Sequence, residues 1–235
     1  MANRVLLNNV DHAELRVAPG PLPQEAAVNQ VIVLPAEYEA VQRDYPILFR
    51  HTEAGALQTV AVLGLAPGEN LFQAEGGWAA SHVPALLQRG PFLIGFTGPG
   101  TEGEPMIHID LDDPRVGAES GQPLFLPQGG NAPYLEHVGG ILRTIHAGRE
   151  HAGPVAAALD AAGLIQPIDI KVNLGDAGTV VLDQYFTVAA DRLAALDGEA
   201  LERLHRAGAL AAAFFIAASL GNMQRLIDRK LARGT

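Results

Sequence analysis

The chain has 235 residues, of which 48% are hydrophobic and 18% are charged, and it contains no cysteine. This composition is typical of a folded globular protein, and the lack of cysteine excludes disulfides, thiolate metal sites and a cysteine nucleophile. The formal net charge of −10 leaves no basic stripe for a phosphate backbone, so we expect no nucleic-acid partner.

The first half of the chain, up to about Pro127, has the pattern of short β-strands. Runs of aliphatic and β-branched residues alternate there with turn residues. The strands are predicted over QVIVLP, PILF, ALQTVAVLGL, PFLIGF and PMIHIDLDD. Two short helices are expected between them, over residues 35–44, which begin with Pro35, and over residues 80–90, which end at Gly90.

After Gly130 the pattern changes to mostly helix. Residues 132–153 and 154–163 predict two helices, because a proline opens the second and a glycine closes it. A β-hairpin follows from Ile168 to Val188, with its turn at GDAG. Its apolar positions are Ile168, Ile170 and Val172 on one arm and Val180, Leu182 and Tyr185 on the other. Three further helices are predicted, so the fold class is α+β, with a sheet-rich N-terminal half and a helical C-terminal half.

The longest apolar tract runs from Ala207 to Gly221. It is shorter than the roughly 18 residues that a bilayer-spanning helix needs, so we expect no membrane span. We expect instead a core helix that is apolar all round, with buried residues at Leu210, Phe214, Phe215 and Ala217. The N-terminal apolar run is too short for a signal peptide, which favours a cytoplasmic protein.

Six segments resemble, in order and over nearly the whole chain, the bacterial SapC family. They are RDYPILF, VLGLAPGENLFQAEGGW, HVPALLQRGPFLIGF, IHIDLDD, GQPLF and the stretch from LDQYFTV to GNMQRL. The resemblance implies a single SapC-like domain over residues 1–235, and leaves open a sub-boundary near residues 127–131. It implies a link to a surface layer through the family's name, and no catalytic residue.

The segment from Asn70 to Phe96 is the predicted recognition surface. Glycines and prolines bracket its aromatic residues, and such loops place aromatic side chains at a surface. The predicted ligand-binding residues are Asn70, Phe72, Trp78, His82 and Arg89. The alternative is that Phe72 and Trp78 fill the core, and that Asn70 closes a turn by bonding its own backbone.

The strand HIDLDD carries the sharpest local pattern of polar residues. His108 and Asp110 share one face of a strand, and a His-x-Asp pair supplies two of the three ligands of a non-haem iron site. The missing histidine would have to come from elsewhere in the chain, and the alternative is a polar sheet face. We therefore expect no bound metal and no cofactor.

Phosphate-loop, dinucleotide, zinc-protease and serine-hydrolase motifs are all absent from the sequence. We therefore expect a non-enzymatic binding or accessory protein that recognises an unknown protein, peptide or small molecule. One alternative is a metal-dependent oxygenase or hydrolase centred on His108 and Asp110. A second is a surface-layer-associated structural protein. The sequence does not predict the oligomeric state.

Overall fold

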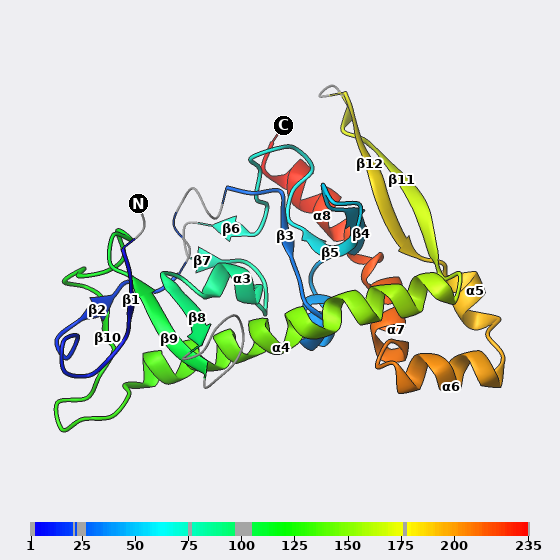
Figure 1. Cartoon of the computed structure of the whole chain (residues 1–235). Helices are drawn as coiled ribbons and strands as arrows, with labels where there is room; N and C mark the ends of the chain where they lie inside the picture. Colours follow the sequence, from blue (N-terminus) through cyan, green and yellow to red (C-terminus); the bar gives the residue numbers. More distant parts are fainter. Residues whose placement is uncertain are drawn as a thin grey trace. The chain divides into compact units, whose positions relative to one another are not determined.

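The computed structural model describes residues 3–20, 22, 27–74, 77–96, 105–175 and 178–234. Its elements confirm the predicted α+β class, with a strand-rich first half and a mostly helical second half (Figure 1). The chain separates into two compact units, each built from two segments. Unit 1 is Met1–Leu22 with Ala85–His146, and unit 2 is Pro23–Pro84 with Ala147–Thr235. Residues 127–131 lie inside unit 1.

Unit 1 contains a three-stranded antiparallel sheet in the order β1-β9-β8. Its elements are β1 (Arg4–Leu6), β2 (Arg16–Val17), α3 (Ala85–Gln88), β8 (Phe92–Phe96), β9 (Pro105–Asp110), β10 (Gln122–Pro123) and the first part of α4 (Pro133–Ala161). The sheet buries Phe92 and Ile109 in a cluster with Leu135, Val138 and Leu142 of α4. Those three helix positions are three and four residues apart, so they form one apolar stripe.

Unit 2 contains a five-stranded antiparallel sheet in the order β11-β12-β4-β5-β3. The strands of this sheet are β3 (Gln30–Ile32), β4 (Ile47–His51), β5 (Leu57–Val62), β11 (Ile165–Asn173) and β12 (Thr179–Val188). Two short strands of the same unit, β6 (Gln73–Ala74) and β7 (Gly77–Trp78), pair with each other in a separate sheet. Three successive residues of β4, Ile47 to Phe49, are completely buried. A strand buried at both even and odd positions is covered on both faces, so β4 lies at the centre of the core of this unit.

The predicted hairpin is confirmed, and its first arm begins three residues earlier than expected, at Ile165. β11 and β12 pair so that Ile168 faces Tyr185, Ile170 faces Leu182 and Val172 faces Val180. The apolar alternation therefore indicated the correct register. Residues 176–177 of the predicted turn lie outside the described residues.

The two helices predicted on either side of Pro154 are one continuous helix, α4. Proline removes one backbone hydrogen bond and crowds the preceding residue. That preceding residue is Gly153, which has no Cβ to meet the proline ring. Buried side chains before and after the proline, such as Ile145 and Leu159, hold both parts of the helix in place. The prediction of a break was therefore wrong.

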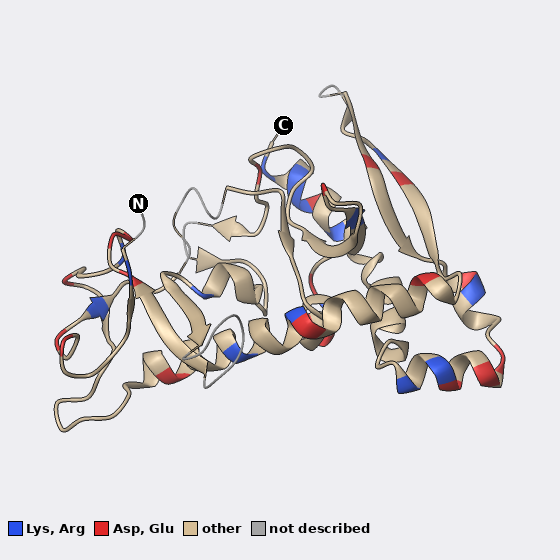
Figure 2. Ribbon diagram, viewed as in Figure 1, with Lys and Arg blue, Asp and Glu red and all other residues tan. Residues whose placement is uncertain are grey.

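The remaining helices belong to unit 2. They are the 3-10 turn η1 (Pro35–Glu37), α2 (Tyr38–Val41), α5 (Ala190–Ala194), α6 (Gly198–Arg206), α7 (Leu210–Ser219) and α8 (Asn222–Ala232). The last of the three helices predicted after the hairpin, a single helix over residues 209–234, is in the structure the two helices α7 and α8. On α6, Arg203 pairs with Glu199 and Arg206 with Glu202, one turn apart, and Figure 2 shows acidic positions in the first part of this helix and basic positions in its last part.

The burial predicted for α7 needs correction. Phe214 is 53% exposed, and Leu210, Phe215 and Ala217 are only partly buried. The buried stripe consists of Ala212, Ala213, Ile216 and Ser219. The small residues in this stripe let the helix approach its neighbours closely. Phe214 lies outside the stripe, so its side chain is left in solvent. A helix that is apolar all round is thus not buried all round.

One helical stretch in the described part of the chain, Leu210–Ala232, is long and apolar enough to cross a membrane. Core helices of soluble proteins meet the same criterion, so this is weak evidence, and nothing in the described residues shows a membrane protein. The stretch is made of α7 and α8, and its central polar residues, Ser219 and Asn222, hydrogen-bond to the backbone near the start of β4.

Candidate functional site

The loop between β5 and β6 is built by a glycine and a glutamate. A Cβ atom at Gly64 would lie 2.2 Å from the carbonyl oxygen of Glu69, so only glycine allows the chain to fold back this tightly. The Glu69 carboxylate accepts a 2.8 Å hydrogen bond from the backbone N–H of Leu65, which closes the loop. The loop therefore leaves the sheet in a defined direction and delivers Asn70 and Phe72 to the core.

Three aromatic rings contact one another in a row that leads from this core to the surface. Phe72, 1% exposed, lies between the buried Tyr45, at 4.4 Å between ring centroids, and Trp78, at 6.4 Å and nearly parallel. Trp78 is only partly buried, and its Nε1 donates a 2.5 Å hydrogen bond to the Tyr45 hydroxyl. Burial raises the pKa of Tyr45, so its hydroxyl stays neutral and able to donate. The indole is thus held from beneath and at its nitrogen, while part of it meets solvent.

His82 is tied to the same cluster. The Tyr45 hydroxyl donates to the backbone carbonyl of His82, and the His82 ring places Nε2 3.0 Å from the Glu37 carboxylate. Glu37 is 4% exposed and also accepts a hydrogen bond from the backbone N–H of Leu34. Because the carboxylate can only accept, Nε2 carries the proton in this pair. The ring of His82 is therefore fixed in position.

The C-terminal helix α8 holds the loop from the other side, and Figure 2 shows the basic positions along its ribbon in blue. Arg229 lies 4.6 Å from the centroid of the Phe72 ring and donates to the carbonyl of Ala79. Lys230 pairs with Glu69 at 2.7 Å. Arg233 donates to the carbonyls of Asn70, Leu71 and Gln73. Each of these three cations therefore helps to position the loop.

The predicted recognition residues separate into three groups. Trp78 and His82 lie together at the surface of unit 2. Asn70 and Phe72 are buried, and Asn70 accepts from the backbone N–H of Phe72, which is the turn-closing role given as the alternative. These two residues therefore support the surface from beneath, and their contact with a ligand stays a prediction. Arg89 follows α3 in unit 1. Residues 75–76 lie outside the described residues.

His108 and Asp110 do share one face of β9, as predicted. Among the described residues, no group of three or more histidine, aspartate or glutamate side chains is arranged to hold a metal ion. The His108 ring lies directly over Gly95, where a Cβ atom would come 2.4 Å from the ring. Within the described residues its buried Nδ1 has no hydrogen-bond partner. The pair therefore remains two candidate ligands on a sheet face.

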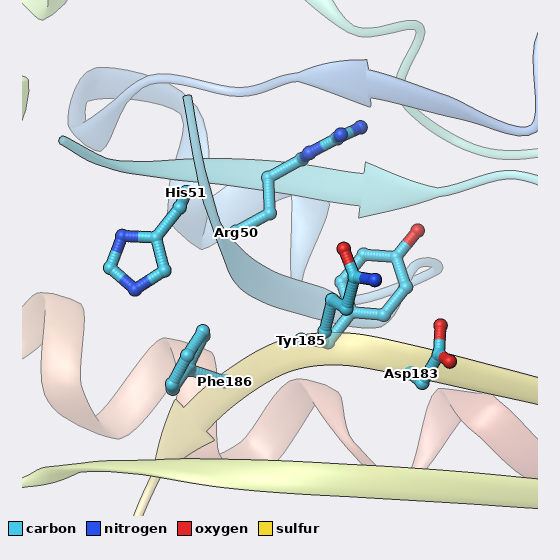
Figure 3. Close-up of a pocket in the computed structure, with 6 residues that line it drawn as sticks. Arg50, His51, Asp183, Tyr185 and Phe186 are labelled. Atoms are coloured by element: carbon cyan, nitrogen blue, oxygen red, sulfur yellow. The ribbon is translucent and has the colours of Figure 1, made fainter. Parts of the chain in front are cut away.

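A polar pocket, which the sequence reasoning missed, lies where β12 separates from β4 (Figure 3). β12 pairs with β4 only through Tyr185 and Phe186. Just before them, Asp183 and Gln184 stand opposite a single residue of β11, which is a β-bulge. Gln184 has φ of +62°, and is the non-glycine residue with positive φ in the described chain. Such strain persists where the surroundings impose it, and it often marks a functional site.

The pocket has a volume of about 310 Å³ and is lined by Arg50, His51, Asp183, Gln184, Tyr185 and Phe186. Figure 3 shows Arg50 and His51 leaving β4 in opposite directions, as neighbouring strand residues do. The rings of His51 and Phe186 meet edge to face at 4.9 Å on one side. On the other side, Tyr185 donates a 2.8 Å hydrogen bond to the Gln30 side chain. The two sides differ in character, one aromatic and one polar.

One signal for this pocket was present in the sequence. The apolar positions of the second hairpin arm step by two from Val180 to Leu182 and then by three to Tyr185. A strand keeps its inward face with a step of three only when an extra residue bulges out. The irregular step locates the bulge, although it does not reveal that Arg50 and His51 border it.

Comparison with known proteins gives one match. The family model described as SapC matches residues 7–226. No curated protein and no solved structure matches the chain.

Proposed function

The chain belongs to the SapC family, and from the geometry of unit 2 we propose that it is a non-enzymatic binding or accessory protein. Its recognition surface is the part of the Asn70–Phe96 segment that belongs to unit 2, centred on Trp78 and His82. The partner is a protein, a peptide or a small molecule that presents an apolar group to the indole. We propose a cytoplasmic location, which cell fractionation tests.

The observation that carries the proposal is the way Trp78 is held. A partly exposed tryptophan is free to move unless its ring and its nitrogen are both engaged, and here Phe72 and Tyr45 engage them. Holding an aromatic side chain in one orientation lowers the entropy cost of binding. Rigid, partly exposed tryptophans of this kind are typical anchor residues of interfaces.

Affinity capture from native cells tests the proposal, with Trp78→Ala and Phe214→Ala compared with the wild type. Phe214 is the matched control, because it is an exposed aromatic residue of the same unit that makes no contact with the Trp78 cluster described above. We expect the partner to be retained by wild type and Phe214→Ala and lost with Trp78→Ala. With the partner in hand, Trp78→Ala should weaken binding by about 2 kcal/mol or more.

Fluorescence separates this role from a purely architectural one, because Trp78 is the sole tryptophan. A surface anchor should be quenched by acrylamide, and its emission should change when the partner binds. Strongly blue-shifted emission without quenching would contradict the proposal. So would a loss of about 3 to 5 kcal/mol in the free energy of unfolding on Trp78→Ala, which is the cost of truncating a core aromatic.

A further inference from the structure

The pocket at the β12 bulge brings two opposite charges to one cavity without pairing them. Arg50 at the end of β4 and Asp183 in the bulge both line it. Neither forms an ion pair with any residue that the structure describes. Both charges act on the Tyr185 hydroxyl. Burial raises the pKa of this hydroxyl, the positive charge of Arg50 lowers it, and the negative charge of Asp183 raises it. Figure 3 shows Arg50, Tyr185 and Asp183 toward one side of the pocket, and His51 and Phe186 toward the other.

The bulge lies between Asp183 and Tyr185, the residue of β12 that pairs with Arg50 of β4. In a regular strand, Asp183 and Tyr185 would share a face, and Tyr185 lies opposite Arg50 in the register of β4 and β12. The extra residue, Gln184, turns the chain between them and displaces Asp183 from this regular position. A cation and an anion that border one cavity in this way can be bridged by a ligand that carries both complementary charges.

The other side of the pocket supplies an apolar surface and a fixed imidazole. Nδ1 of His51 lies 2.9 Å from the carbonyl oxygen of Gly55, and a carbonyl only accepts, so Nδ1 carries the proton. This contact fixes the orientation of the imidazole ring. The Phe186 ring packs against the edge of this imidazole and provides contact area for an apolar group.

We propose that this pocket binds a small zwitterion, specifically a free α-amino acid with an apolar side chain. Arg50 binds the carboxylate through its forked N–H donors, Asp183 binds the ammonium group, and the side chain lies toward Phe186. A volume of about 310 Å³ is at the lower end for ligand pockets, which suits a molecule of this size. Asp183 disfavours a phosphate or other multiply charged anion, and Arg50 disfavours a metal cation.

Isothermal titration of the wild-type protein with L-leucine, N-acetyl-L-leucine and L-leucinamide tests the two charges separately. The acetylated ligand lacks the ammonium group, and the amide lacks the carboxylate. We expect L-leucine to bind, and each derivative to bind about tenfold more weakly or worse, because each loses a charge-assisted hydrogen bond. These measurements need no mutation, so they do not depend on any variant folding.

Variants then assign each charge to its residue. Arg50→Gln should weaken L-leucine about tenfold or more, and Asp183→Asn should remove the preference for L-leucine over N-acetyl-L-leucine. Arg43→Gln and Asp191→Asn are the matched controls, because both residues are exposed and neither lines the pocket, and they should leave the affinity unchanged. Circular dichroism of each variant verifies the fold.

Three results would overturn the proposal: no heat of binding with L-leucine, equal affinity for L-leucine and its acetylated form, or full binding by folded Arg50→Gln. This site shares no residue with the Trp78 surface. Loss of amino-acid binding therefore leaves partner capture through Trp78 untouched, and the two proposals fail separately.

Discussion

Ser219 in α7 and Ile47 at the start of β4 are joined by a hydrogen bond across 172 positions of the sequence. The backbone N–H of Ile47 donates to the serine hydroxyl at 2.8 Å, and the hydroxyl donates in turn to the carbonyl of Ile216 at 2.7 Å. Three residues later, the Asn222 amide donates to the carbonyls of Gln42 and Tyr45. The junction of α7 and α8 is therefore bonded to the backbone that leads into the central strand of unit 2.

Replacing Ser219 with alanine should lower the free energy of unfolding by about 1 to 3 kcal/mol. The reason is that Ser219 is completely buried, so the N–H of Ile47 would be left without a partner and without access to water. Urea denaturation measures this, with Ser120→Ala as the control because Ser120 is exposed. A Ser219→Ala variant as stable as that control would show that the hydrogen bond contributes nothing.

Two residues of α7 that are two positions apart, Phe214 and Ile216, should respond very differently to truncation to alanine. Ile216 is completely buried and Phe214 is 53% exposed, although Phe214 is the larger side chain. We expect Ile216→Ala to cost about 2 to 5 kcal/mol and Phe214→Ala to cost less than about 1 kcal/mol. Chemical denaturation of the two variants side by side measures the difference. Equal costs would mean that Phe214 is covered in solution by something other than the residues described.

The spacing of apolar residues predicted those parts of the fold in which buried and exposed side chains alternate regularly along the chain. The hairpin is the clearest case, because Val172 alternates with polar residues on its arm and does face Val180 of the other arm. This spacing failed to predict burial on α7, where apolar residues surround the helix and nothing local shows which of them pack. It also failed at Pro154, because Gly153 and buried residues farther along α4 allow the helix to continue.

The candidate sites depended on contacts between segments that are far apart in the sequence. Trp78 was correctly placed near His82, which is close in the sequence, but their common partner Tyr45 was not foreseen. Arg233 reaches the carbonyl of Asn70 across 163 positions. No local sequence pattern encodes such a bond, and Asn70 is buried in the structure.

The close approach of His108 to Gly95 makes a prediction for unit 1. A methyl group at position 95 would come within 2.4 Å of the imidazole, so Gly95→Ala should lower the free energy of unfolding by about 1 to 3 kcal/mol unless the ring moves away. His108→Ala removes the obstacle, so the double variant should recover most of that loss. A double-mutant cycle by thermal denaturation measures the coupling. Additive effects would show that the ring is not held over Gly95.

The ion pair of Glu69 and Lys230 predicts how the Trp78 loop responds to acid. Burial alone would raise the pKa of Glu69, but the bonds from Lys230 and from the backbone N–H of Leu65 outweigh it, so the net pKa is lowered. A carboxyl whose pKa is lower in the folded state stabilises the fold above its unfolded pKa. That stabilisation is lost as the pH falls through the lower, folded pKa.

The stability difference between wild type and Glu69→Gln should therefore be full at neutral pH and should disappear in acid. The glutamine mimics the protonated side chain, so both proteins become equivalent once Glu69 is protonated. Lys230→Met removes the main bond that lowers the pKa of Glu69, so in that background the difference should be smaller and should disappear at a higher pH. Denaturation followed by Trp78 fluorescence at a series of pH values measures both, with Lys171→Met as the exposed-lysine control. A difference that persists unchanged in acid would mean that the carboxylate charge of Glu69 does not hold the loop, and that the side chain acts only through its shape.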